Sequence, residues 1–202
     1  MGNTSVITKT LIQKALNYTE YRSLINELLA ENRVTGDFMK NNDWMLEYTK
    51  QNNHRMDRGS TVFKATDALK ETITSISEPW IWLVITEGWC GDAAQIIPAF
   101  VKMVDLNPKF SIKFILRDAH PKVMDAFLTN GSRAIPKLVV LNTNTLEVMG
   151  TWGPRPAVPQ QMTEDYKNNA DKNFDKYVEV LHNWYNEDRF ESIQKELVEC
   201  LK

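Results

Sequence analysis

The sequence predicts an α/β fold in which a mixed sheet is covered by helices and preceded by a helical extension. Two observations predict this class. Segments with the apolar or alternating pattern of strands begin only at Trp80, and helical start and stop residues lie between them. The predicted core order is β-α-β-α-β-β-α. A helix joins the first two strands, which should be parallel, and a short turn makes the last pair antiparallel.

Residues 1–78 form the predicted N-terminal helical extension. Apolar residues recur at helical spacing over 8–30, which predicts one amphipathic helix there. Further helices are expected from Asp43 to His54 and from about Thr61 to Ile76. The extension carries no obvious chemistry. It either packs on one face of the sheet or offers a docking surface, of which a homodimer interface is one form.

Residues 79–202 form the predicted α/β domain with C-terminal helices. Strands are expected at 80–86, 110–118, 136–142 and 146–152. Helices are expected at 91–107, at 121–131 and from about 158 to the end. Phe174, Tyr177, Trp184 and Tyr185 in the last helices are interpreted as packing residues.

Composition narrows the class of protein. The net charge of the 202 residues is -2, which argues against a general nucleic-acid binder. The N-terminus lacks the apolar segment of a signal peptide, and the longest apolar run is too short to span a bilayer. We therefore expect a cytoplasmic protein with no membrane partner. His54, His120 and His182 are scattered without ligand spacing, so no metal site is predicted.

Cys90 lies where the first predicted strand gives way to a helix. The first turn of a helix offers unpaired N–H groups and a partial positive charge, and both stabilise a thiolate. The pKa of a cysteine there can fall from about 8.5 to between roughly 3.5 and 7.5. Asp92 opposes this if its charge lies near the sulfur, or else it only favours the start of the helix.

A lone cysteine is most often a small buried apolar residue. Three features favour a functional Cys90 instead. It lies at the carboxyl edge of the sheet, where open α/β sheets place their sites. The flanking "TEGWCG" is loop-like, and an Ile135-Pro136 pair follows before the next strand.

The motif "GWCGDA" after an apolar strand, Pro98 in the following helix and "AIP" before the hairpin resemble the thioredoxin superfamily. The resemblance covers about residues 80–182 and implies a thioredoxin-like fold. The combination of "WCGDA", "LRD", "LTNGSRAIPKLVVLN" and "WGPRP" is similar to a bacterial thioredoxin-like subfamily with a single active-site cysteine. It implies a role in cell redox homeostasis.

The resemblance assigns roles to particular residues. Cys90 would be catalytic, and a cis proline would present the backbone of Ile135 to an extended substrate. No cofactor is implied, apart from a low-molecular-weight thiol as co-substrate. The implied substrate-binding residues are Trp89, Gly91, Asp92, Ile135 and Pro136.

Two departures from the superfamily pattern affect the chemistry. Ala93 stands where the second cysteine would be, and Val84 stands where a buried aspartate would help to move protons. Glu87 or Asp92 could replace that acid, or both could be solvated. Arg117 and Arg155 could give electrostatic support to a thiolate or a bound carboxylate, or could form structural ion pairs.

Two hypotheses follow. In the first, the protein is a monothiol thiol-disulfide oxidoreductase: Cys90 forms a mixed disulfide with a protein disulfide or a small thiol, and an external thiol resolves it. This hypothesis predicts a depressed pKa for Cys90. In the second, the protein is an inactive binding module that uses the Ile135-Pro136 groove. Cys200 could resolve a disulfide only if the C-terminus folds back over the sheet edge.

Overall fold

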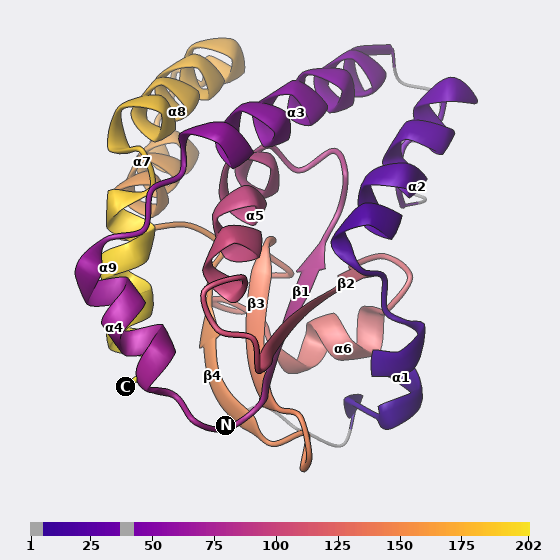
Figure 1. Cartoon of the computed structure of the whole chain (residues 1–202). Coiled ribbons are helices and arrows are strands. Elements are labelled where there is room, and N and C mark those ends of the chain that lie inside the picture. The colour runs from indigo at the N-terminus through magenta and orange to yellow at the C-terminus, as the bar shows by residue number, and fades with distance from the viewer. Residues whose placement is uncertain (1–5, 37–42) are drawn as a thin grey trace.

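The computed structural model of the chain describes residues 6–36 and 43–202. Parts of the predicted N-terminal extension, residues 1–5 and 37–42, lie outside the described residues. Over the described residues the element order is helices, then β-α-β-α-β-β, then helices. Figure 1 shows the sheet in the centre with helices around it. The predicted fold class is confirmed.

The sheet has the strand order β2-β1-β3-β4. Its strands are β1 (Trp80–Thr86), β2 (Phe110–Leu116), β3 (Lys137–Asn142) and β4 (Val148–Trp152). β1 pairs with β2 in parallel, whereas β1–β3 and β3–β4 are antiparallel, so both predicted pairings are confirmed. Every residue of β1 is buried because this apolar strand is central and covered on both faces.

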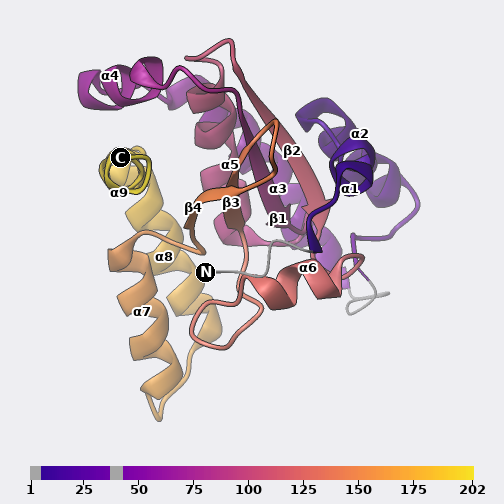
Figure 2. The same cartoon turned by 90° about the horizontal axis from the view of Figure 1, so that it is seen from below.

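Helices cover both faces of the sheet. α5 (Gly91–Val104) lies on one face and α6 (Pro121–Ala126) on the other (Figures 1 and 2). α3 (Asp43–Val62) packs on the outside of α5. The C-terminal helices α7 (Ala157–Asn168), α8 (Phe174–Asp188) and α9 (Glu191–Cys200) lie on the β4 side of the sheet (Figure 1).

The helix predicted over 8–30 is wrong as a single element. The structure contains α1 (Lys9–Lys14) and α2 (Tyr18–Ala30). Between them, Leu16 exchanges two backbone hydrogen bonds with Phe114 of β2, of 2.9 and 2.8 Å. Asn17 then caps α2 and forms a capping box with Glu20. The Asn-x-x-Glu spacing of a capping box was present in the sequence and marks this break.

Other predicted boundaries also shift, most of all those of three helices. α3 continues to Val62, eight residues beyond the predicted end at His54. Its continuation turns Met56 inward, where this side chain is 1% exposed. α4 (Asp67–Ser75) begins only after Thr66, which caps it. The helix predicted over 121–131 ends at Ala126, and the next residues form a turn with a bridge between Thr129 and Ser132.

One hydrophobic cluster joins the extension to the sheet. Tyr21 and Ile25 of α2 and Leu69 and Ile73 of α4 are at most 1% exposed and belong to the same cluster as the strands. The extension therefore packs on the core. A division into units at residue 78, and a homodimer interface on these helices, stay predictions.

Within residues 6–36 and 43–202, no helix combines the length and apolar character needed to cross a bilayer.

Candidate functional site at Cys90

Cys90 caps the N-terminus of α5, directly after the turn that ends β1. Its backbone N–H donates to the Glu87 carbonyl at 3.1 Å, which closes the turn. The Ala93 N–H donates to Cys90 Sγ at 3.5 Å, and the thiol donates to the Ile135 carbonyl at 3.4 Å. The sulfur therefore lies between the first turn of a helix and the backbone before Pro136.

Two cis peptide bonds lie at this edge of the sheet, Ile135–Pro136 and Gly153–Pro154. The second segment packs on the first: Gly153 has φ +112°, and a side chain there would collide with the Pro136 carbonyl. Thr129 Oγ1 also donates to the Gly153 carbonyl at 3.3 Å. Because Gly153 packs against Pro136, Arg155, two residues further along the chain, lies at the site.

Asp92 is buried and doubly partnered. Arg155 Nη2 lies 2.7 Å from Asp92 Oδ2, and Tyr185 Oη donates to Asp92 Oδ1 at 2.8 Å. Burial raises the pKa of Asp92, and the charge of Arg155 opposes that rise. The expectation that Asp92 could be solvated is wrong, because α8 and the segment after β4 enclose it.

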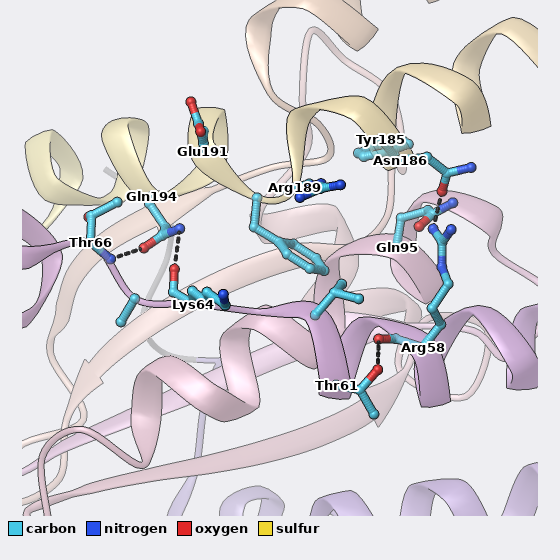
Figure 3. Close-up of a pocket in the computed structure, with 13 residues that line it drawn as sticks. Arg58, Thr61, Lys64, Thr66, Gln95, Tyr185, Asn186, Arg189, Glu191 and Gln194 are labelled. Atoms are coloured by element: carbon cyan, nitrogen blue, oxygen red, sulfur yellow. Dashed lines mark hydrogen bonds between the residues drawn. The ribbon is translucent and has the colours of Figure 1, made fainter.

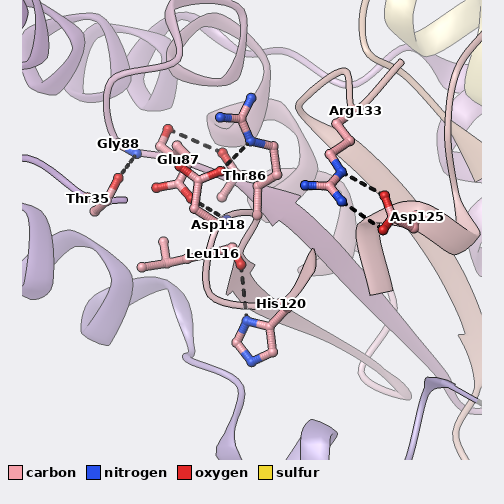
Figure 4. A network of polar contacts seen from close by, with 10 residues as sticks. Thr35, Thr86, Glu87, Gly88, Leu116, Asp118, His120, Asp125 and Arg133 are labelled. Atoms are coloured by element: carbon pink, nitrogen blue, oxygen red, sulfur yellow. Dashed lines mark hydrogen bonds and ion pairs between the residues drawn. The ribbon is translucent and has the colours of Figure 1, made fainter. Parts of the chain in front are cut away.

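Glu87 is also fully buried, so solvation is wrong for this carboxylate too. Its Oε1 accepts the Asp118 N–H at 2.9 Å, and Gly88 N–H donates to Thr35 Oγ1 at 2.8 Å (Figure 4). Burial raises the pKa of Glu87, while hydrogen bonds from Thr35 and the Asp118 backbone oppose this. Glu87 Oε2 and Asp118 Oδ2 make no hydrogen bond of normal geometry within the described residues.

Arg117 joins the Glu87 cluster to the cysteine loop. Its Nε donates to Asp118 Oδ1 at 2.7 Å, so Arg117 forms the structural ion pair that was one of the two alternatives for it. Its guanidinium also lies 4.8 Å from the centre of the Trp89 ring. A cation over an indole face is attracted to it, so Arg117 helps to fix Trp89 beside Cys90.

Gly91 lies against α3 and α8. A side chain at this position would collide with the Tyr48 hydroxyl. That hydroxyl is 2.9 Å from His182 Nε2, and His182 Nδ1 is 3.0 Å from Gln95 Nε2. Burial lowers the pKa of His182 to about 3, so the ring is neutral and serves as a hydrogen-bonding link.

The expected depression of the Cys90 pKa is wrong for the resting protein. Cys90 is 7% exposed, and burial raises the pKa of its thiol to about 12. The charge of Asp92 raises it further, whereas the backbone N–H of Ala93 and the charge of Arg155 lower it. Burial thus raises the pKa of the thiol more than the start of the helix lowers it, and the resting group is a protonated thiol.

A cavity of about 490 Å³ opens beside Cys90. It brings together most of the predicted site residues, which are Trp89, Cys90, Gly91, Asp92, Arg117, Ile135 and Arg155. Pro136 and Glu87 do not line it. Pro136 directly follows Ile135 in the chain, and the Glu87 carbonyl accepts the Cys90 N–H. No local sequence pattern indicated that α3 and α8 contribute to its lining.

The wall residues that were missed as site residues include four aromatic ones: Trp44, Tyr48, Phe174 and Tyr177. Phe174 and Tyr177 were interpreted as packing residues, yet Phe174 is 45% exposed at the cavity. Tyr185 was also interpreted as a packing residue, but its hydroxyl donates a hydrogen bond to Asp92. Aromatic pairs near the starts of α3 and α8 were present in the sequence, but the sequence did not show that they face one cavity.

A larger cavity, of about 710 Å³, lies between the α3–α4 connection and the α8–α9 corner. Figure 3 shows Gln194 bonded there to Thr66 and Lys64, with Arg58 beside Asn186. It contains no cysteine, and its basic side chains Arg58, Lys64 and Arg189 are exposed. Thiol chemistry therefore points to the smaller cavity.

Cys200 lies elsewhere. Its thiol contacts the Thr151 carbonyl of β4 at 3.5 Å, and it does not line the cavity at Cys90. Both cysteines are free. Across residues 6–36 and 43–202, no group of three or more His, Cys, Asp or Glu side chains is placed to hold a metal ion.

Two solved structures are similar to this chain over most of its length. The chain is similar to a crystal structure of a protein of unknown function from Pseudomonas aeruginosa, at 15% identity and a TM-score of 0.49, covering 92% of this chain and 97% of that one. It is also similar to an HIV epitope scaffold, at 14% identity and a TM-score of 0.50, covering 92% and 98%. No curated protein matches.

The family comparison covers more than half of the chain. Residues 38–167 match the family model described as "Thioredoxin", a span that includes Cys90, Ile135–Pro136 and the whole sheet. The chain therefore belongs to the thioredoxin family.

Proposed function

We propose that the protein is a monothiol thiol-disulfide oxidoreductase, with Cys90 as its nucleophile. One observation carries the proposal: the Cys90 sulfur accepts the Ala93 N–H at a helix start, contacts the backbone of Ile135 and lines a cavity. A disulfide in that cavity would meet the sulfur beside backbone donors that stabilise a thiolate.

The reaction exchanges one sulfur–sulfur bond for another. Cys90 Sγ attacks one sulfur of the substrate disulfide, the substrate S–S bond breaks, and a Cys90 mixed disulfide forms. The Cys90 sulfur is oxidised, and the leaving sulfur is reduced and takes the proton that Cys90 gives up. Ala93 offers no second thiol at this site, so an external thiol must resolve the intermediate. Its sulfur attacks the substrate sulfur, the bond from that sulfur to Cys90 Sγ breaks, a new disulfide joins the external and substrate sulfurs, and Cys90 takes the proton that the external thiol loses.

Asp92 is the group we assign to the proton transfer. The burial that raises the pKa of its carboxyl also makes it a better proton acceptor than a solvated aspartate. Transfer of the Cys90 proton to Asp92 would remove the charge that opposes the thiolate. Arg155 would stay beside the thiolate as a positive charge.

The test is mixed-disulfide formation followed by intact mass. The Cys200→Ser protein is exposed to small disulfides at pH 8, and a single adduct at Cys90 is expected. Addition of an external thiol should then release the adduct and restore the original mass. Cys90→Ser with Cys200 intact is the control, and an adduct of equal yield there would assign the chemistry to Cys200 instead. Absence of any Cys90 adduct would overturn the proposal.

A second candidate is a binding module without turnover. The raised pKa of Cys90 favours it, since a thiol of pKa about 12 is almost wholly protonated at neutral pH. In this case Cys90→Ser would keep every binding partner and every cellular effect of the protein. Loss of the effect in Cys90→Ser, with partners retained, would support the oxidoreductase.

A further inference from the structure

We infer that the cavity at Cys90 takes a small disulfide that carries carboxylates, in preference to an extended protein segment. This inference rests on the thiol-disulfide exchange proposed above and names its substrate class. It is drawn from the size, the charge and the free hydrogen-bond donors of the cavity.

The size and walls suit a small molecule. The volume of about 490 Å³ falls within the 300–1,000 Å³ that is typical of small-molecule sites. α3 and α8 both contribute to the lining, where the Trp44 and Phe174 ring centroids lie 5.6 Å apart. Trp44 also stacks on Tyr48 at 4.9 Å. These rings belong to the same lining as Cys90, which is itself only 7% exposed.

The charge of the lining is positive. Its basic residues are Arg117, Arg133, Arg155 and Lys167, and its one acidic residue is Asp92. Three arginines have aspartate partners, at 2.7 Å to Asp118, 2.6 Å to Asp125 and 2.7 Å to Asp92. Lys167 forms no ion pair among the described residues, so a positive charge remains for an anionic ligand.

Hydrogen-bond donors in the lining also lack acceptors. Trp89 Nε1 and Arg155 Nε are buried and make no hydrogen bond within the described residues. Arg117 uses only Nε toward Asp118, which leaves its two terminal nitrogens for another acceptor. Buried donors without acceptors cost stability, so a ligand rich in carboxylate oxygens would satisfy groups that the protein leaves open.

The apolar part of the ligand has a matching surface. Phe174 and Tyr177 line the cavity, and Tyr166, which does not line it, stacks on Tyr177 with ring centroids 4.4 Å apart. Methylene groups and a disulfide sulfur pack well against aromatic rings. A compact molecule with carboxylates at its ends and a disulfide in its middle therefore fits the cavity better than a peptide with a continuous backbone.

The experiment compares disulfides of different charge. The Cys200→Ser protein is mixed with glutathione disulfide, which is anionic, with hydroxyethyl disulfide, which is neutral, and with cystamine, which is cationic. A decapeptide that carries one mixed disulfide is the fourth probe. Each rate of adduct formation at Cys90 is divided by the rate for a free peptide of residues 85–95 in the same buffer, which removes the intrinsic reactivity of each disulfide.

The expected order is glutathione disulfide, then hydroxyethyl disulfide, then cystamine, with about tenfold between the first and last, and salt should reduce the difference. Lys167→Glu should lower the glutathione disulfide rate and raise the cystamine rate, by about threefold each. Lys172→Glu makes the same charge change on a residue outside the cavity lining, and its rates should match the parent protein.

The outcomes separate the two proposals. Equal normalised rates for the three small disulfides, a preference for cystamine, or a decapeptide rate equal to that of glutathione disulfide would overturn the inference and leave thiol exchange intact. No adduct at Cys90 with any probe would overturn the proposed function itself.

Discussion

Asp92 and Glu87 are both buried carboxylates within three residues of Cys90, but they have different partners. Both oxygens of Asp92 are satisfied, one by Arg155 and one by Tyr185. Glu87 has a backbone partner for one oxygen, while its other oxygen and Asp118 Oδ2 lack a hydrogen bond of normal geometry. Arg117 pairs with Asp118 rather than with Glu87.

The difference teaches which carboxylate can stay ionised. Asp92 has a guanidinium at 2.7 Å, whereas Glu87 faces another carboxylate, whose charge raises its pKa in addition to the larger effect of burial. We therefore expect the charged form to be better supported at Asp92 than at Glu87. The same carboxylate-to-amide substitution should then have opposite effects at the two positions.

The largest effect is expected for Asp92→Asn. It removes the charge opposite Arg155, whose side chain is 17% exposed, and leaves that guanidinium without its ion-pair partner. Breaking a buried pair from one side costs about 3 kcal/mol of unfolding free energy. Urea denaturation at pH 7 measures this. The double variant Asp92→Asn with Arg155→Met should recover part of the loss, and an unchanged loss would argue against the pair as its cause.

The next effect tests how tightly Gly91, the residue before Asp92, packs against Tyr48. Gly91→Ala introduces a methyl group against the Tyr48 hydroxyl and should cost about 2 kcal/mol in urea denaturation. Tyr48→Phe removes that oxygen and its contact with His182, at a cost of about 1 kcal/mol. The double variant should be more stable than the sum of the two losses predicts. Strict additivity would contradict the contact.

A smaller effect, of opposite sign to that at Asp92, is expected for Glu87→Gln. The raised pKa of Glu87 means that the folded protein holds this proton more tightly than the unfolded chain. Stability is therefore lost as the pH rises from the ordinary glutamate value of 4.5 toward the raised folded value. Glutamine cannot ionise, so the variant should gain about 1 kcal/mol on the wild type between pH 4 and pH 7.

Urea denaturation at these two pH values gives the comparison. Thr35→Ser, which keeps the hydroxyl beside Gly88, is the matched control and should show the wild-type pH dependence. A Glu87→Gln protein that loses stability relative to the wild type as the pH rises would show that Glu87 is the charged group.

The smallest effect distinguishes the two carboxylates by their influence on the reactivity of the Cys90 thiol. The charge of Asp92 raises the pKa of Cys90, so Asp92→Asn should increase the thiolate fraction at equilibrium and speed Cys90 alkylation by about threefold at pH 8. Disulfide exchange should instead slow in this variant, because the proton acceptor that we assign to the exchange is lost. Glu87→Gln should leave the rate unchanged. In the Cys200→Ser background, the wild-type rate should rise about tenfold per pH unit from pH 7 to pH 10, because the pKa of the thiol lies near 12. A plateau below pH 9 would contradict the raised pKa.

Local pattern determined much of the fold. The limits of β1 match the apolar run Trp80–Thr86, since a central strand is buried on both faces and its sequence shows this directly. The position of Cys90 at the start of α5 also follows from the local change of pattern. The break at Asn17 was readable too, but the helical periodicity on both sides of it concealed the capping box.

Tertiary structure decided the state of the thiol and the shape of its site. The helix start alone predicts a thiolate, yet burial by α3, α5 and α8 and the charge of Asp92 make Cys90 a protonated thiol. The cavity walls come from Trp44 and Phe174, which are 130 positions apart in the chain. Desolvation and ion pairing depend on contacts between segments that are far apart in the chain, and a local sequence pattern does not show these contacts.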